Sequence, residues 1–156
     1  MTSTFTFYSP AKINLDLKVI DKKPDGYHLI ESNFQILNFF DEIEIIVTNS
    51  RVVDFRTDNS SLDNSENIAF KAINFMDQYK KKEIGLDIFL KKKIPIGSGL
   101  GGGSSNAASV LLILNHFYHA KLSIDHLKNI AKNLGADVPF FLDGYNCFVS
   151  GIGEVL

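Results

Sequence analysis

A glycine-rich segment is the part of the sequence best suited to chemistry. Residues 97–105 read Gly-Ser-Gly-Leu-Gly-Gly-Gly-Ser-Ser and contain five of the chain's 11 glycines. Without a Cβ, glycine lets backbone N–H groups approach an anion, and the free N–H groups of a following helix add partial positive charge. The segment stands between an alternating apolar stretch and an apolar helix-forming stretch. This order of strand, glycine loop and helix predicts a phosphate-binding site rather than a flexible linker.

The glycine spacing of this segment is close to that of two known phosphate-binding motifs. Gly97 and Gly102 have the spacing of a P-loop, but Gly103 stands where that motif requires lysine, so the P-loop is excluded. Gly97, Gly99 and Gly102 match the dinucleotide fingerprint, which also needs an acidic residue at the end of the next strand, about 20 residues further on. Asp125 has nearly that spacing, but it stands at an expected helix start. Dinucleotide binding therefore stays open as the weaker alternative.

Asp137 and Lys12 are charged residues for which chemistry alone leaves a catalytic and a structural interpretation open. Phosphoryl transfer needs a group that orients the attacking hydroxyl or accepts its proton, and a rigidly held carboxylate can do this. Asp137 lies just before Pro139, so a helix N-cap is an equally good interpretation on chemistry alone. Lys12 is an isolated charge in an alternating stretch, where solvent exposure is the ordinary expectation. If it faced the site, Lys12 would pair with Asp137 and stabilise developing negative charge.

Hydrophobic periodicity indicates the elements that must position these groups. Alternation predicts strands at 5–7, 13–19, 29–39, 42–48, 51–57, 86–90 and 145–149, and helical spacing predicts helices at 68–79, 104–118 and 123–135. In the second strand the apolar positions Ile13, Leu15, Leu17 and Val19 are expected to face the core. One of residues 63–65 is expected to cap the first helix, and Gly135 to end the last one in a left-handed conformation. Strands first and helices later predict an α+β fold.

Composition narrows the class of protein. The 156 residues allow one domain, or one and part of a second, and 45% hydrophobic with 22% charged residues is typical of a soluble globular chain. A net charge of −2 gives no electrostatic reason to expect nucleic acid or an anionic membrane. Cys147 is the single cysteine, which excludes an internal disulfide and a cysteine-based zinc site. No segment resembles a signal peptide or a membrane span, so a cytoplasmic protein is expected.

The glycine-rich segment, read from Pro95 to Ala108, resembles the ATP-binding motif of the galactokinase–homoserine kinase–mevalonate kinase–phosphomevalonate kinase superfamily. Three further motifs, beginning at Pro10, Pro24 and Gly135, resemble the branch that phosphorylates 4-diphosphocytidyl-2-C-methyl-D-erythritol: Pro-Ala-Lys-Ile-Asn-Leu, Pro-Asp-Gly-Tyr-His and Gly-Ala-Asp-Val-Pro. The resemblance implies a two-domain α+β kinase whose N-terminal half is like the second domain of ribosomal protein S5. Residues 1–156 would form that ATP- and substrate-binding half, and the C-terminal domain would be absent from this chain.

The resemblance also implies roles for individual residues. ATP with Mg²⁺ would donate its γ-phosphate to the 2-hydroxyl of the cytidyl substrate, in the non-mevalonate route to isoprenoid precursors and in a bacterial cytoplasm. The implied catalytic residues are Lys12 and Asp137. The implied substrate-binding residues are Asn14, Tyr27, His28, Phe34, Asp137 and Ile152. The implied ATP-binding residues are Asn67, Ile68, Lys92, Pro95, Gly97, Ser98, Gly99, Leu100, Gly101, Gly102, Gly103, Ser104 and Ser105.

Other interpretations remain open at this point. Another kinase of the superfamily would act on mevalonate, homoserine or a sugar, but it would not need the Pro-Asp-Gly-Tyr-His motif. A non-catalytic nucleotide-binding or RNA-binding module is the alternative from a different class, although the near-neutral charge lacks the basic footprint of RNA binding. Lys92 belongs to a run of three lysines, which more often marks a solvated strand end. No protein-built metal site is expected, since His116, His119 and His126 have no metal-ligand neighbours.

Overall fold

A six-stranded mixed sheet forms one layer of the structure, a computed structural model that describes residues 3–24, 26 and 28–151. Four strands follow the order β1 (Thr4–Asn14), β3 (His28–Thr48), β5 (Gly85–Lys91) and β4 (Val53–Thr57). Two short strands, β2 (Lys18–Lys22) and β6 (Cys147–Val149), pair with the first part of β3. Only β4 and β5 pair in parallel among these described strands. The long β3 therefore connects the main sheet to the β2 and β6 end of the molecule.

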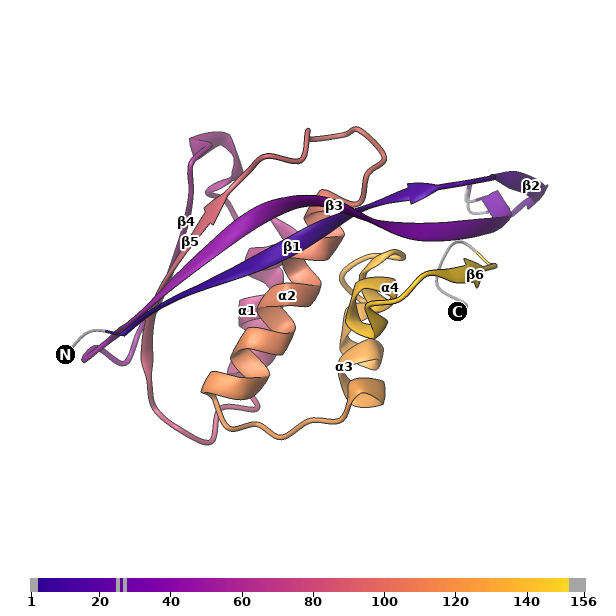
Figure 1. Cartoon of the computed structure of the whole chain (residues 1–156). Coiled ribbons are helices and arrows are strands. Elements are labelled where there is room, and N and C mark those ends of the chain that lie inside the picture. The colour runs from indigo at the N-terminus through magenta and orange to yellow at the C-terminus, as the bar shows by residue number, and fades with distance from the viewer. Residues whose placement is uncertain (1–2, 25, 27, 152–156) are drawn as a thin grey trace.

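The helices form the second layer, on one side of the sheet (Figure 1). They are α1 (Ile68–Asp77), α2 (Gly102–Phe117), α3 (Ile124–Ala131) and α4 (Val138–Asp143), with a 3₁₀ turn, η1 (Ser60–Leu62), before α1. The central helix α2 packs against α1, α4 and β1, and it buries nine of its 16 residues. Such burial explains why the apolar residues of α2 are not confined to one stripe. The predicted α+β class is confirmed.

A bulge in β1 reverses the expected orientation of one strand. The β1–β3 register shifts between Pro10 and Lys12, and the consecutive residues Ala11 and Lys12 are both buried. A bulge re-aims the side chains beyond it to the opposite faces of the sheet. The prediction that Ile13, Leu15, Leu17 and Val19 face the core was wrong, because all four side chains are exposed. The bulge accounts for Ile13, which follows it on β1. Leu15 and Leu17 lie between β1 and β2, and Val19 lies on β2, so the predicted strand 13–19 is not one strand.

Several element boundaries also differ from the predictions. β3 is one strand, where two were predicted, because Phe40 and Asp41 continue its pairing with β1 opposite Pro10 and Ser9. Asn67, rather than a residue of 63–65, caps α1, since its side-chain oxygen accepts the N–H of Ala69 at 2.9 Å. α3 ends at Ala131, and Gly135 is not among the glycines with positive φ, so that cap prediction was wrong. The short α4 was not predicted, and Gly144, with φ of 72°, ends it.

Candidate active site

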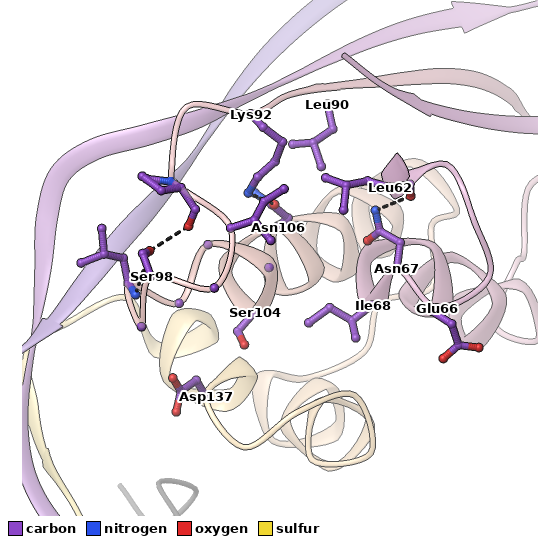
Figure 2. A pocket seen from close by; sticks show the side chains of 18 residues that line it. Leu62, Glu66, Asn67, Ile68, Leu90, Lys92, Ser98, Ser104, Asn106 and Asp137 are labelled. Carbon is purple, nitrogen blue, oxygen red and sulfur yellow. Dashed lines mark hydrogen bonds between the residues drawn. The ribbon is translucent and has the colours of Figure 1, made fainter. Parts of the chain in front are cut away.

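A cavity of about 400 Å³ lies between the glycine-rich loop and the start of α1 (Figure 2). Its wall contains all but one of the thirteen residues for which the family resemblance implies ATP contacts. The exception, Ser105, is fully buried and is not among the lining residues, whereas Ser104 is. The structure therefore favours Ser104 as the serine that faces a ligand. The other lining residues are Leu62, Glu66, Leu90, Ile96, Asn106 and Asp137.

The loop backbone has the conformation of an anion cradle. Gly97, Gly99 and Gly101 all have φ between 71° and 76°, a region that other residues rarely adopt. Gly101 is the N-cap of α2, and it provides no side-chain cap within the described part of the chain. The first N–H groups of α2 are therefore left without a side-chain acceptor. Ser98 fixes the turn by donating its hydroxyl to the carbonyl oxygen of Pro95 at 2.7 Å. Phosphate suits this arrangement of helix start and glycine loop.

Close packing at Gly101 joins the loop to two other elements. The backbone N–H of Lys12 on β1 donates to the carbonyl oxygen of Leu100 at 2.9 Å. A Cβ at Gly101 would lie 2.9 Å from Cζ of Phe141 on α4 and 3.1 Å from Cγ of Lys12. Only glycine lets the loop approach β1 and α4 this closely. The phosphate loop, β1 and α4 are thereby held in one fixed relation.

The ammonium of Lys12 lies at the meeting point of these elements. Its Nζ is 3.3 Å from a carboxylate oxygen of Asp137, donates to Oδ1 of Asn14 at 2.6 Å, and lies 4.0 Å from the ring centroid of Phe34. Lys12 is only 4% exposed, so the ordinary expectation of a solvated lysine is wrong here. The ammonium is held by a carboxylate, an amide oxygen and a ring face, all of which favour a positive charge.

Asp137 has the position of a helix cap without making its hydrogen bond. It precedes α4 with φ of −84°, and its side chain accepts no capping hydrogen bond from the described residues. Instead the carboxylate lines the cavity, pairs with Lys12 and keeps about a quarter of its surface exposed. The site interpretation of Asp137 is thus favoured over the structural cap. In Figure 2 the side chains of Ser104 and Asp137 enter the same cavity from α2 and from the start of α4.

The residues predicted to bind substrate are only partly brought together. Asn14 contacts Lys12, and its Nδ2 donates to the hydroxyl of buried Ser32 at 2.9 Å. Phe34 is 2% exposed beneath Lys12 and packs edge-on against Phe140, so it lies in the core rather than on an open surface. His28 is exposed at the first position of β3, away from the cavity wall. The predicted contacts Tyr27 and Ile152 lie outside the described residues.

Several side chains that line the cavity, among them those at the start of α1, also stabilise the fold. Asn67 caps α1 and also donates its Nδ2 to the carbonyl oxygen of Leu62 at 3.0 Å. A Cβ on Gly103 would lie 3.7 Å from Cδ1 of Ile68, so these two residues adjoin. The alternative interpretation of Lys92 as a solvated strand end is not supported, since its side chain is 10% exposed and forms an ion pair with Asp41.

Asp41 and Asn106 are site residues that sequence reasoning missed. Asp41 is completely buried and Asn106 is 2% exposed. Nδ2 of Asn106 donates to Asp41 at 2.9 Å, and its Oδ1 accepts from Nζ of Lys92 at 2.9 Å. One signal was present in the sequence: Asn106 directly precedes the apolar part of α2. Asp41 between Phe40 and Glu42 gave no comparable indication.

The donor set suits a magnesium ion carried by a nucleotide rather than one caged by protein. No group of three or more His, Cys, Asp or Glu side chains able to hold a metal ion occurs among the residues that the structure describes. Mg²⁺ commonly binds through substrate phosphates, waters and one or two protein oxygens. The Ser104 hydroxyl at the cavity wall is an oxygen of that kind.

Sequence comparison finds relatives over nearly the whole chain. The family described as "GHMP kinases N terminal domain" matches residues 67–145. The 4-diphosphocytidyl-2-C-methyl-D-erythritol kinase of Francisella tularensis subsp. tularensis (strain FSC 198) is 43% identical over 151 residues, which cover 96% of this chain and 55% of the relative. The kinase of the same name from Sulfurihydrogenibium sp. (strain YO3AOP1) is 46% identical over 149 residues, 96% of this chain and 54% of the relative. The chain spans about half the length of the curated relatives it matches.

Solved structures share the fold. A crystal structure of 4-(cytidine 5'-diphospho)-2C-methyl-D-erythritol kinase superposes with a TM-score of 0.84 at 38% identity and covers 97% of this chain and 54% of that one. Methanococcus jannaschii mevalonate kinase superposes with a TM-score of 0.69 at 16% identity, over 96% of this chain and 54% of that one, which shows the fold alone. No helix in the described part of the chain is long and apolar enough to cross a membrane.

Proposed function

The chain belongs to the family of GHMP kinase N-terminal domains, and from that premise we propose that it binds ATP with Mg²⁺ and phosphorylates the 2-hydroxyl of 4-diphosphocytidyl-2-C-methyl-D-erythritol. The observation that carries the proposal is the Lys12–Asp137 pair at the edge of a glycine-lined cavity. The names of the relatives that match 96% of the chain support the cytidyl substrate. The reaction would take place in a bacterial cytoplasm, where this substrate and ATP meet.

In the proposed reaction, the loop and the start of α2 bind the phosphates of ATP through backbone N–H groups. The substrate hydroxyl oxygen attacks the γ-phosphorus, the bond to the β–γ bridging oxygen breaks, and ADP leaves. Asp137 orients the hydroxyl and accepts its proton as the new bond forms. Lys12 holds the Asp137 carboxylate in place and stabilises negative charge on the transferring group. Bound Mg²⁺ would supply charge neutralisation, with the Ser104 hydroxyl at the cavity wall as the available protein ligand.

The first residues of β3 would bind the cytidyl substrate. His28 is exposed beside β2 and can donate to or accept from the edge of cytosine, with Tyr27 as the ring that stacks on it. Asn14 lies between Lys12 and Ser32, where it fixes the ammonium and borders the path of the attacking hydroxyl. We further propose that residues 1–156 form the ATP- and substrate-binding domain and that a second domain completes the cleft. The share of the relatives that the chain covers supports this division.

The two weaker alternatives have less support. A dinucleotide site needs an acidic residue at the end of a strand after α2, but α3 follows instead and Asp125 lies exposed in its first turn. An RNA-binding module would require a basic surface, and the chain carries a net charge of −2.

The proposal is tested by phosphoryl transfer. The chain, and the same chain completed with the C-terminal part of the Francisella tularensis relative (the completed chain), are incubated with Mg-ATP and one acceptor at a time. The acceptors are the cytidyl substrate, mevalonate, homoserine and galactose, and products are followed by ³¹P NMR. Transfer to the cytidyl substrate by the completed chain is expected. Transfer only to another acceptor would assign a different substrate, and binding of RNA without ATP would contradict the kinase proposal.

A further inference from the structure

Three consecutive backbone N–H groups that lead from β5 into the phosphate loop are held by two carboxylates. Asp58 accepts the N–H of Lys92 at 3.0 and 3.2 Å through its two oxygens. Oδ1 of Asp41 accepts the N–H groups of Lys93 at 2.7 Å and Ile94 at 2.8 Å. Carboxylate acceptors make stronger hydrogen bonds than carbonyl acceptors do. The path of the chain from β5 toward the glycines is therefore fixed before the loop begins.

The second oxygen of Asp41 is occupied as well. Oδ2 pairs with Nζ of Lys92 and accepts from Nδ2 of Asn106. All four donors thus converge on a carboxylate with no exposed surface. A charge buried this deeply is tolerated only when it is paired and its hydrogen bonds are satisfied. Asp41 consequently links three separate parts of the chain: β3, the entry to the loop and the N-terminal part of α2.

The partners of Lys92 leave part of its ammonium available to the cavity. An ammonium has three N–H donors, and the structure gives two acceptors to this one, Oδ2 of Asp41 and Oδ1 of Asn106. Lys92 also lines the cavity, and its Nζ lies 3.1 Å from where a Cβ on Gly102 would stand. Figure 2 shows the Lys92 side chain pointing toward Asn106 at the start of α2. The third donor is in place for an acceptor atom of a bound nucleotide.

We propose that Asp41 and Asn106 are positioning residues of the nucleotide site. They hold the Lys92 ammonium at the cavity wall with one donor left for the nucleotide, and Asp41 also fixes the entry to the phosphate loop. This inference rests on the proposed function, since it takes the cavity ligand to be Mg-ATP. Neither residue needs to touch the ligand to control its affinity.

The test compares three variants of the 156-residue chain with the parent, using calorimetric titration with Mg-ATP and thermal unfolding. Asp41→Asn keeps the side-chain shape but leaves the Lys92 ammonium without its charge partner. Asp41→Asn/Asn106→Asp exchanges the carboxylate and the amide, which returns a carboxylate to the side of Lys92. Tyr118→Phe is the matched control, because it removes a buried hydrogen bond, 2.8 Å from the Tyr118 hydroxyl to Asp77, at the other end of α2.

The expected result is a loss of at least about tenfold in Mg-ATP affinity for Asp41→Asn, the effect of losing one charge-assisted hydrogen bond at the ligand. The exchange variant should recover to within about threefold of the parent, and Tyr118→Phe should bind as the parent does despite a lower melting temperature. A purely structural role would lower melting temperatures and leave the affinities unchanged.

Each other outcome overturns a specific statement. A folded Asp41→Asn chain with parent affinity would show that the cluster serves stability alone. If Asp41→Asn does not fold, the Mg-ATP affinity of the exchange variant tests the positioning role instead. A folded exchange variant that binds Mg-ATP about tenfold more weakly than the parent would overturn that role. A parent chain that binds no Mg-ATP would contradict the proposed function, and the inference would fall with it.

Discussion

The ammonium of Lys12 on β1 lies 3.3 Å from the carboxylate of Asp137 at the start of α4, across the edge of the glycine-rich loop. The pair depends on two features of the backbone. The bulge after Pro10 turns Lys12 inward, and the missing Cβ of Gly101 lets the loop pass between β1 and α4. Because the carboxylate accepts no capping hydrogen bond from the described residues, it remains available to the cavity that it lines.

Removing the charge of Asp137 should abolish turnover while preserving nucleotide binding. In the completed chain, Asp137→Asn and Lys12→Met each act on groups that are needed only as the hydroxyl is activated, so kcat should fall by about 100-fold or more. The dissociation constant for Mg-ATP should change by less than about threefold. Steady-state kinetics and calorimetry measure the two quantities, with the exposed Asp125→Asn as control. An Asp137→Asn enzyme with near-normal kcat would refute its assignment as the base.

His28 provides a test of the second binding site. His28→Ala leaves a base-edge hydrogen bond unmade, which typically costs about 1–3 kcal/mol, so affinity for the cytidyl substrate should fall about 5- to 150-fold. Affinity for Mg-ATP should be unchanged, because His28 does not line the cavity. The dissociation constants of both ligands are measured by titration of the completed chain. The control is His126→Ala, a substitution at an exposed position of α3. Equal losses for both ligands would place His28 outside the cytidine site.

The loop glycines offer a matched pair of substitutions. At Gly99, with φ of 76°, an added Cβ meets nothing within 4 Å among the described residues, so Gly99→Ala should cost only the left-handed conformation, about 1 kcal/mol. Gly101→Ala adds a contact of 2.9 Å with Phe141, and overpacking typically costs a further 1–3 kcal/mol, roughly. Urea unfolding should therefore rank Gly101→Ala as the less stable variant. Equal stabilities would contradict the close approach of loop and α4.

The buried phenol of Tyr118 should make the chain less stable in alkaline solution. Burial raises the pKa of its phenol well above the ordinary value of 10.0, and the hydrogen bond to Asp77 adds to the effect. Above pH 10 the unfolded chain loses this proton while the folded chain keeps it, so the free energy of unfolding falls as pH rises. Tyr118→Phe should be less stable at pH 7 by about 1 kcal/mol and should show a shallower decline above pH 10. Parallel declines in chemical unfolding would show that Tyr118 is not the cause.

The parts of the site that follow local rules could be predicted from the sequence. The glycine loop and its position before α2 came from residue type and spacing, whereas the catalytic roles of Lys12 and Asp137 came from the family resemblance. The inward orientation of Lys12 could not be derived, because it depends on a register shift against β3 that no local pattern reveals. Asp41 was missed for a similar reason. Its four donors come from residues 92–94, which follow β5, and from Asn106 on α2, and only the tertiary structure brings these segments to β3.

We propose that Mg-ATP and the cytidyl substrate bind on either side of the Lys12–Asp137 pair. Amide chemical-shift mapping of the isotope-labelled chain can locate both ligands in one experiment. Mg-ATP is titrated first and the cytidyl substrate second. We expect Mg-ATP to shift the amide signals of residues 97–104 and the cytidyl substrate to shift those of Asn14 and His28. Both ligands should shift the amide signal of Asp137. Shifts by Mg-ATP confined to residues outside the glycine loop, or no shifts at saturating Mg-ATP, would contradict the proposal.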